Sequence, residues 1–233
     1  MSYQVLNVYP HDITCFTEGL EWHDSTLYES GGLNGESKLV RVSLKDGKDI
    51  KKVDLDKQYF GEGISILNGK LYQLTYKENK CFVYDPQTFK KTGEFTYQGQ
   101  GWGMTNNGKQ LIMDTGSNEL FFIDPTTFTV VSKIAVLGVP RDIDNSEVFI
   151  NELEWVDGYV YANVWMTNLI LKIDPSNGKI VAQADLTDLY DRYIPEHDGS
   201  RVLNGIAYNS ATKTFYITGK KWPKLFEVRF TYY

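Results

Sequence analysis

The sequence predicts an all-β fold, a five-bladed β-propeller formed by the whole of residues 1–233. A unit made of a short strand, a tight turn and a second strand occurs five times along the chain. The units begin about 40 to 50 residues apart, which is the length of a four-stranded propeller blade. No amphipathic helical pattern of any length appears between them. These observations together favour a propeller over other all-β folds.

The clearest copy of the unit occupies residues 60–76. Its turn is Asn68-Gly69, a strong hairpin signal because both residues readily adopt positive φ. A third strand at 81–84 ends at an Asp-Pro pair, and Pro can open a turn but cannot continue a central strand. Extending this pattern along the chain, we expect blades at about 16–55, 60–97, 101–136, 150–186 and 203–233.

The fifth unit ends after three strands, so its outer strand is missing from the C-terminal part of the chain. Residues 3–8 have strand-forming side chains but no neighbouring partner. We expect this N-terminal strand to complete the last blade, which would close the ring and leave no exposed edge there.

Composition limits the classes of function. Aromatic residues make up 14% and hydrophobic residues 42% of the chain, which is typical of a globular protein. A net charge of -6 gives no electrostatic support for a nucleic-acid partner. No apolar run approaches the roughly 20 residues that span a membrane. Cys15 and Cys81 form no disulfide framework and are expected to be small buried residues. His11, His23 and His197 show no metal spacing, so each is expected to be structural or exposed.

The start of the chain lacks the basic and apolar segments of a signal sequence. Taken alone, this indicates a cytoplasmic protein. A removed signal would leave the same start and would indicate a secreted or periplasmic protein, so the compartment stays open. We expect a monomer, because a closed propeller needs no partner and no isolated apolar stripe is present.

Two ring positions are expected to form a site. If the strands of each blade run antiparallel from the axis outward, the entrance of the first strand and the exit of the second lie on one face. The entrance carries Glu18, Glu62, Trp102, Asn151 and Asn204, and the exit carries Gly32, Tyr76, Gly116, Trp165 and Lys220. The long connections 137–149 and 187–202 belong to this face. The scaffold positions repeat while these positions differ, which favours a functional site over a structural role.

Each candidate also has a structural interpretation. Glu18 and Glu62 could be solvated carboxylates at strand ends, the usual case for an isolated Glu. Their glycine and aromatic neighbours instead favour partial desolvation, which would raise a carboxyl pKa toward the acid/base range. Gly on both sides of Trp102 favours an exposed platform over a core position. A turn role stays open for Asn151 and Asn204.

At these residues the chain resembles the plant and bacterial type of glutaminyl-peptide cyclotransferase, or glutaminyl cyclase. The segments that carry the resemblance are Phe-Thr-Glu-Gly-Leu at 16–20, Phe-Gly-Glu-Gly at 60–63, Gly-Trp-Gly-Met at 101–104, Asn-Glu-Leu-Glu at 151–154, Ala-Asn-Val-Trp at 162–165 and Thr-Gly-Lys-Lys-Trp-Pro-Lys-Leu-Phe-Glu at 218–227. The resemblance implies a five-bladed propeller that converts the N-terminal glutamine of peptides or proteins to pyroglutamate and releases ammonia. It implies no catalytic metal or other cofactor, and it leaves a structural calcium ion open.

The resemblance also implies roles for individual residues. The family's catalytic glutamate falls on Glu62, its asparagine on Asn151 and its lysine on Lys220. Its substrate-binding aromatic residues fall on Phe16, Phe60, Trp102 and Trp165, with Tyr76 where members can carry Trp.

Glu18 departs from the family pattern, because we associate a Gln with this position. A second carboxylate could raise the pKa of Glu62 or bind the substrate ammonium. Glu18 and Asn204, which share the ring position of Glu62, complete the candidate substrate-binding residues.

The chemistry needs a neutral α-amine to attack the side-chain amide carbon, and then a proton for the departing ammonia. We expect Glu62 to carry that proton, and either Asn151 or Lys220 to stabilise the oxyanion. The aromatic residues would fold the glutamine side chain and exclude water. Two alternatives remain: a propeller lactonase or hydrolase whose divalent cation is held by Glu18, Asn151 and Asn204, and a non-catalytic propeller that binds peptides.

Overall fold

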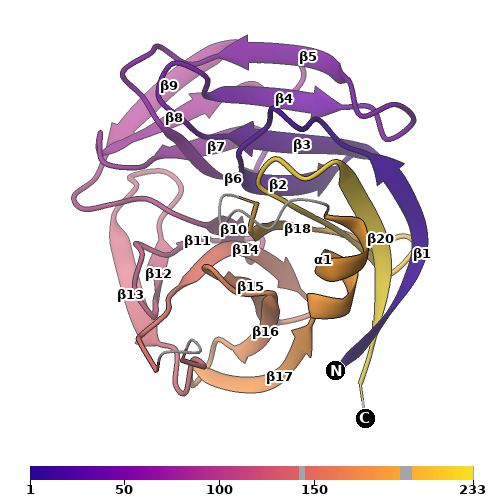
Figure 1. Ribbon diagram of the computed structural model, residues 1–233. Coiled ribbons are helices and arrows are strands. Elements are labelled where there is room, and N and C mark those ends of the chain that lie inside the picture. The colour runs from indigo at the N-terminus through magenta and orange to yellow at the C-terminus, as the bar shows by residue number, and fades with distance from the viewer. Residues whose placement is uncertain (142–144, 195–200, 233) are drawn as a thin grey trace.

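Five four-stranded sheets surround a central axis in the computed structural model, which describes residues 1–141, 145–194 and 201–232 (Figure 1). This arrangement confirms the predicted five-bladed β-propeller. Blade one contains β2 (Thr17–His23), β3 (Thr26–Gly31), β4 (Lys38–Val42) and β5 (Asp49–Asp54). Blade two contains β6 (Gly61–Leu67), β7 (Lys70–Thr75), β8 (Lys80–Tyr84) and β9 (Lys91–Thr96). Blade three contains β10 (Met104–Asn106), β11 (Leu111–Met113), β12 (Glu119–Ile123) and β13 (Val130–Ala135).

The remaining two blades complete the ring. Blade four contains β14 (Ile150–Val156), β15 (Tyr159–Val164), β16 (Leu169–Asp174) and β17 (Lys179–Asp185). Blade five contains β18 (Leu203–Asn209), β19 (Thr214–Gly219), β20 (Lys224–Thr231) and, as its outer strand, β1 (Ser2–Pro10). Within each blade the strands of the first three positions follow chain order and pair antiparallel.

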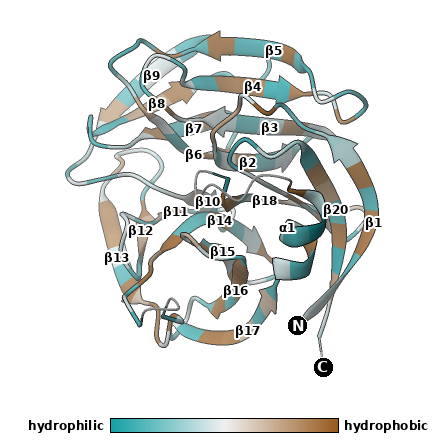
Figure 2. Ribbon diagram, in the orientation of Figure 1, coloured by the Kyte–Doolittle hydropathy of each residue, from teal (hydrophilic) through white to brown (hydrophobic). Residues whose placement is uncertain are grey.

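Burial falls from the axis outward. All of β6 is buried, whereas in β5 and β17 exposed residues alternate with partly buried ones, apart from the buried Ala184. The outer strands accordingly alternate between hydrophobic and hydrophilic residues in Figure 2. The hydrophobic core lies between neighbouring blades, where each sheet packs against the next. Cys15 and Cys81 are both free and buried, as the sequence predicts.

The N-terminal strand closes the ring. β1 pairs antiparallel with β20 from Ser2 opposite Thr231 to Pro10 opposite Lys224. The predicted closure is therefore confirmed, and the strand is longer than the 3–8 segment expected.

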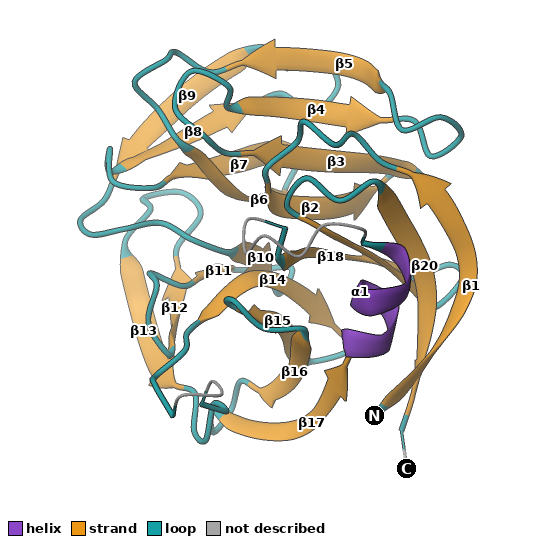
Figure 3. Ribbon diagram, viewed as in Figure 1, coloured by secondary structure: helices purple, strands orange, loops and turns teal. Residues whose placement is uncertain are grey.

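One helix departs from the all-β expectation. α1 (Thr187–Tyr193) lies in the connection between blades four and five (Figure 3). It has seven residues, of which only Leu189 is buried, so it is too short to produce a periodic apolar pattern. No helix in the described part of the chain is long and apolar enough to cross a membrane.

Candidate active site

β-Bulges place the entrance residues. The register of the inner strand slips at the same point in four blades: between Thr17 and Gly19, Gly61 and Ile64, Ile150 and Leu153, and Leu203 and Ile206. The residues inside these slips include Glu18, Glu62, Asn151 and Asn204. A bulge leaves a residue unpaired and re-aims its side chain. The sequence aligned these positions but did not reveal the bulges.

The exit residues are held beside the entrance by one repeated hydrogen bond. In four blades the backbone N–H of the exit residue donates to a carbonyl two positions before the entrance residue: Gly32 to Phe16 (2.8 Å), Tyr76 to Phe60 (3.0 Å), Trp165 to Phe149 (2.8 Å) and Lys220 to Val202 (2.9 Å). The two ring positions predicted from sequence therefore meet on one face in these four blades.

Together they surround a cavity of about 230 Å³. The side chains that line it are Phe16, Glu18, Leu33, Phe60, Glu62, Tyr76, Trp102, Asn151, Trp165 and Lys220. Every predicted site residue except Asn204 is among them. Leu33 was not predicted; it follows Gly31-Gly32 and has a φ of 79°, which nothing in its side chain signals.

The Glu18 carboxylate accepts hydrogen bonds from two side chains, those of Lys220 and Asn204. The Lys220 ammonium lies 2.8 Å from Oε1, and the Asn204 amide donates to Oε2 at 3.3 Å. Asn204 also donates to the carbonyl of Thr17, so it supports Glu18 and does not line the cavity. Burial raises the pKa of the Glu18 carboxyl although the charge of Lys220 opposes the shift.

Glu62 differs from Glu18 in having no hydrogen-bond or ion-pair partner among the described residues. Its side chain makes no hydrogen bond or ion pair with any described residue, yet Glu62 is only 5% exposed. Burial raises the pKa of its carboxyl well above the usual range, the charge of Glu18 raises it further, and Lys220 opposes both. A raised pKa brings a carboxyl closer to the range in which one side chain can both accept and return a proton.

Aromatic rings form a continuous wall around the two carboxyls. Neighbouring ring centroids lie 6.3 Å apart for Phe16 and Phe60, 5.7 Å for Phe60 and Tyr76, 6.4 Å for Tyr76 and Trp102, and 5.6 Å for Trp102 and Trp165. The Lys220 ammonium lies 4.6 Å from the centre of the Phe16 ring. Trp165 is 38% exposed, so this end of the wall faces solvent.

Two exit positions are glycines because rings from the entrance side occupy the space. A Cβ on Gly32 would lie 2.4 Å from the Phe60 ring, and one on Gly116 would lie 2.5 Å from the Trp102 indole. Asp114 holds the backbone on both sides of the contact between Gly116 and Trp102. Its carboxylate accepts the N–H groups of Gly103 (3.0 Å) and Gly116 (3.1 Å). Asp114 was missed by sequence reasoning, since an isolated Asp is ordinarily exposed.

A buried histidine supports the loop that carries Lys220. His11 bonds the carbonyl of Trp222 through Nδ1 (2.7 Å) and the carboxylate of Glu29 through Nε2 (2.9 Å). Glu29 also accepts the hydroxyl of Thr17 at 2.7 Å. Burial alone would lower the pKa of His11, but the neighbouring Glu29 charge prevails and raises it. The structural role expected for His11 is therefore confirmed, His23 is partly exposed, and His197 lies outside the described residues.

Two further glutamates join the blades at the axis. Glu152 accepts the N–H groups of Leu20 (3.0 Å) and Ile206 (2.8 Å), so it ties blade four to blades one and five. Glu154 accepts the N–H of Tyr208 at 2.7 Å. Burial raises the pKa of both carboxyls well above the usual range. Their role is structural, because their oxygens satisfy backbone donors of other blades.

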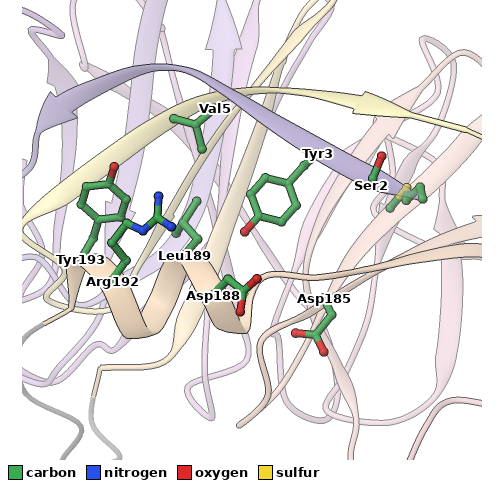
Figure 4. A pocket seen from close by; sticks show the side chains of 9 residues that line it. Ser2, Tyr3, Val5, Asp185, Asp188, Leu189, Arg192 and Tyr193 are labelled. Carbon is green, nitrogen blue, oxygen red and sulfur yellow. The ribbon is translucent and has the colours of Figure 1, made fainter.

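A larger hollow lies elsewhere, between β1 and α1 (Figure 4). Its volume is about 580 Å³, and it is lined by Tyr3, Asp188 and Arg192 among others. It shares no residue with the aromatic cavity. In the part of the chain that the structure describes, no group of three or more His, Cys, Asp or Glu side chains is placed to hold a metal ion.

The fold and the aromatic cavity define a β-propeller with two buried carboxyls, those of Glu18 and Glu62, in a cavity walled by aromatic rings. The family model described as glutamine cyclotransferase matches residues 1–230. The chain belongs to the glutamine cyclotransferase family.

Individual relatives agree with this assignment. A glutaminyl-peptide cyclotransferase from Arabidopsis thaliana is 35% identical over 229 residues, which cover 97% of this chain and 70% of the relative. The crystal structure of Myxococcus xanthus glutaminyl cyclase matches with a TM-score of 0.86 and 31% identity, covering 98% of this chain and 96% of that chain. The β-propeller domain of Myceliophteria thermophila Cps50 (Swd1) matches with a TM-score of 0.51 and 11% identity over 92% of this chain and 65% of that one, and shows the fold alone.

Proposed function

We propose that this protein is a glutaminyl-peptide cyclotransferase, which converts the N-terminal glutamine of peptides or proteins to pyroglutamate with release of ammonia. Family membership and the named relatives support this activity. The observation that carries the mechanism is the unpartnered, buried carboxyl of Glu62 inside a cavity walled by aromatic rings.

The reaction is an intramolecular acyl transfer in which the substrate's own amine is the nucleophile. Its nitrogen attacks the side-chain amide carbon while the Glu62 carboxylate takes the amine proton. The C–N bond to the amide nitrogen then breaks, and Glu62 returns the proton to the departing ammonia. One residue can serve in both steps because its pKa is raised toward the working pH.

Asn151 and Lys220 are proposed to stabilise the oxyanion. Lys220 has three N–H donors and uses one for Glu18, so two remain for the cavity. Asn151 is 3% exposed, and its Oδ1 has no hydrogen-bond partner among the described residues. Its Oδ1 can therefore accept an N–H of the reacting carboxamide, while its Nδ2 group, which donates to no described residue, can donate to the oxyanion. The proposed role of Glu18 is to hold Lys220 and to raise the pKa of Glu62.

The substrate is proposed to be held by apolar contacts with the wall. Phe16, Phe60, Tyr76, Trp102 and Trp165 would bend the glutamine side chain toward its own amine, which favours ring closure over attack by water. No step in this scheme needs a metal ion or other cofactor.

Replacing Glu62 by Gln tests the mechanism. We expect Glu62→Gln to lower turnover of a glutamine-initiated peptide by about 10² to 10⁴-fold, because the proton carrier is lost. Product is measured as the mass loss of one ammonia, and circular dichroism checks the fold. Glu94→Gln, on the outer strand of the same blade, is the matched control. Near-normal turnover by Glu62→Gln would show that the mechanism is wrong.

The alternative of a metal-dependent hydrolase is tested by chelation. Glu18, one of its supposed ligands, already accepts hydrogen bonds from Lys220 and Asn204. We expect pyroglutamate formation to survive exhaustive dialysis against a chelator. Loss of activity that returns with a divalent cation would contradict the proposal.

A further inference from the structure

A second cavity lies between blades two and three, beside the active site. It has a volume of about 420 Å³ and an apolar interior formed mainly by Tyr97, Met113, Phe121, Ile123, Phe128 and Val130. The polar side chains on its wall are Gln98, Gln100 and Thr115, besides the Tyr97 hydroxyl. None of the described residues that line it is charged.

Trp102 lines the active-site cavity and contacts two residues that line the second cavity. The indole Nε1–H donates to Gln100 Oε1 at 2.9 Å, and the indole lies against Gly116, where a Cβ would be 2.5 Å from its Cε2. Gln100 and Gly116 line the second cavity, while Trp102 lines the first. Trp102, Gln100 and Gly116 therefore lie between the two cavities.

The active-site cavity is too small for more than the end of a peptide. Its volume of about 230 Å³ lies below the roughly 300 to 1,000 Å³ of sites that enclose drug-sized ligands. The residues after the glutamine must leave it. An extended peptide advances about 3.3 Å per residue, so one or two residues carry the chain past the indole.

We infer that the cavity between blades two and three binds an apolar side chain at the second or third position of the substrate peptide. This inference rests on the proposed function. The uncharged lining favours aliphatic and aromatic side chains, because a charged side chain would lose its water without gaining a partner. The occupant is thus a later residue of the same substrate peptide whose N-terminal glutamine is cyclised.

Peptide substrates test this selectivity directly. Gln-Leu-Gly-Gly and Gln-Gly-Leu-Gly are compared with Gln-Gly-Gly-Gly, and with peptides that carry Asp in place of Leu. We expect one leucine peptide to show a KM about ten-fold below the glycine peptide, with kcat little changed, because the added contact is present equally in the ground and transition states. The matching Asp peptide should show no such gain.

Two neighbouring valines provide the matched variants. Val130 lines the cavity and Val131 does not, although both lie on β13 and are 57% and 59% exposed. Because both are exposed, Asp at either position is expected to leave the fold intact, which thermal unfolding checks. Val130→Asp should abolish most of the leucine preference, and Val131→Asp should keep it.

Three results would overturn the inference, each in a recognisable way. Equal KM values for all the peptides would assign the cavity to another occupant while leaving the proposed function in place. A leucine preference that persists in Val130→Asp would locate the selective contact elsewhere. Absence of turnover for every glutamine peptide would overturn the proposed function itself, and this inference with it.

Discussion

Glu18 and Glu62 occupy equivalent positions in adjacent blades, but their surroundings give them different chemistry. Glu18 is fixed by Lys220 and Asn204, whereas the carboxyl of Glu62 is free within the cavity. The Glu18 carboxylate also raises the pKa of Glu62 through its charge, while the charge of Lys220 opposes that rise. Glu18 thus raises the pKa of Glu62 without itself taking the proton.

A pH profile should reveal this tuning. Glu62 must be deprotonated to accept the amine proton, so kcat/KM should rise as pH passes its raised pKa. Glu18→Gln removes a like charge and leaves the Lys220 charge uncompensated, so both changes lower the pKa of Glu62. We expect the acid limb to move down by about one pH unit. Titration of the substrate amine is common to both proteins and cancels in the ratio of their profiles. An unmoved limb, or one moved upward, would contradict the tuning.

Sequence alone could place most of the site residues but not their relations. The repeat brought Glu18 and Glu62 to one ring position, and only the family resemblance distinguished them. Their different partners come from Lys220, about 200 residues away in the chain, which no local pattern can connect. Asn204 was expected to bind substrate, but it contacts Glu18 from outside the cavity.

At the scale of elements, the bulged inner strands and the loop after β19 position the site. A bulge depends on the pairing of two strands, so it is invisible in either strand alone. The loop that carries Lys220 is held by His11 and Glu29, which come from the segment after β1 and from β3. α1 was not predicted because seven residues with one buried side chain give no helical period.

Removing the buried histidine should destabilise this loop in a pH-dependent way. We expect His11→Phe to lower the free energy of unfolding by about 3 to 5 kcal/mol, since it leaves Glu29 buried without its partner. The pKa of His11 is raised, so its contribution is complete below its unfolded value of 6.5 and is lost as pH rises through the folded pKa. The pKa of Glu29 is lowered, so its contribution is present above 4.5 and is lost as pH falls.

The deficit of His11→Phe should therefore be largest between about pH 4.5 and 6.5 and smaller at alkaline pH. Urea unfolding across this range measures it, with His23→Phe as a partly exposed histidine control. A deficit that does not change with pH would rule out the charged pair as its source.

At the scale of the whole molecule, the blades are joined by buried carboxylates as well as by apolar packing. Glu152 binds backbone N–H groups of blades one and five. The sequence predicted the number of blades, their order and the closing strand, because these follow from local strand and turn signals. It did not predict the links between blades, which depend on how neighbouring sheets face each other.

Loss of the Glu152 hydrogen bonds between blades should lower the free energy of unfolding of the propeller. Glu152→Leu leaves the N–H groups of Leu20 and Ile206 buried without acceptors, at a cost of about 1 to 3 kcal/mol each. We expect the free energy of unfolding to fall by about 2 to 6 kcal/mol in total. Denaturant unfolding measures this change. The control is Glu119→Leu, at the partly exposed first residue of β12. Unchanged stability would show that the carboxylate does not join the blades.

Pairing of β1 with β20 also sets the order in which the protein can be completed during its synthesis. Within residues 1–233, β1 is synthesised before every other described strand, and its partner β20 (Lys224–Thr231) is synthesised after them. At about 5 to 20 residues per second, the first strand waits roughly 10 to 40 s for that partner. None of its residues is fully buried even in the finished fold, so it exposes little apolar surface during the delay. Blade five is the first to be started and the last to be finished, so the ring can close only after β20 has been synthesised.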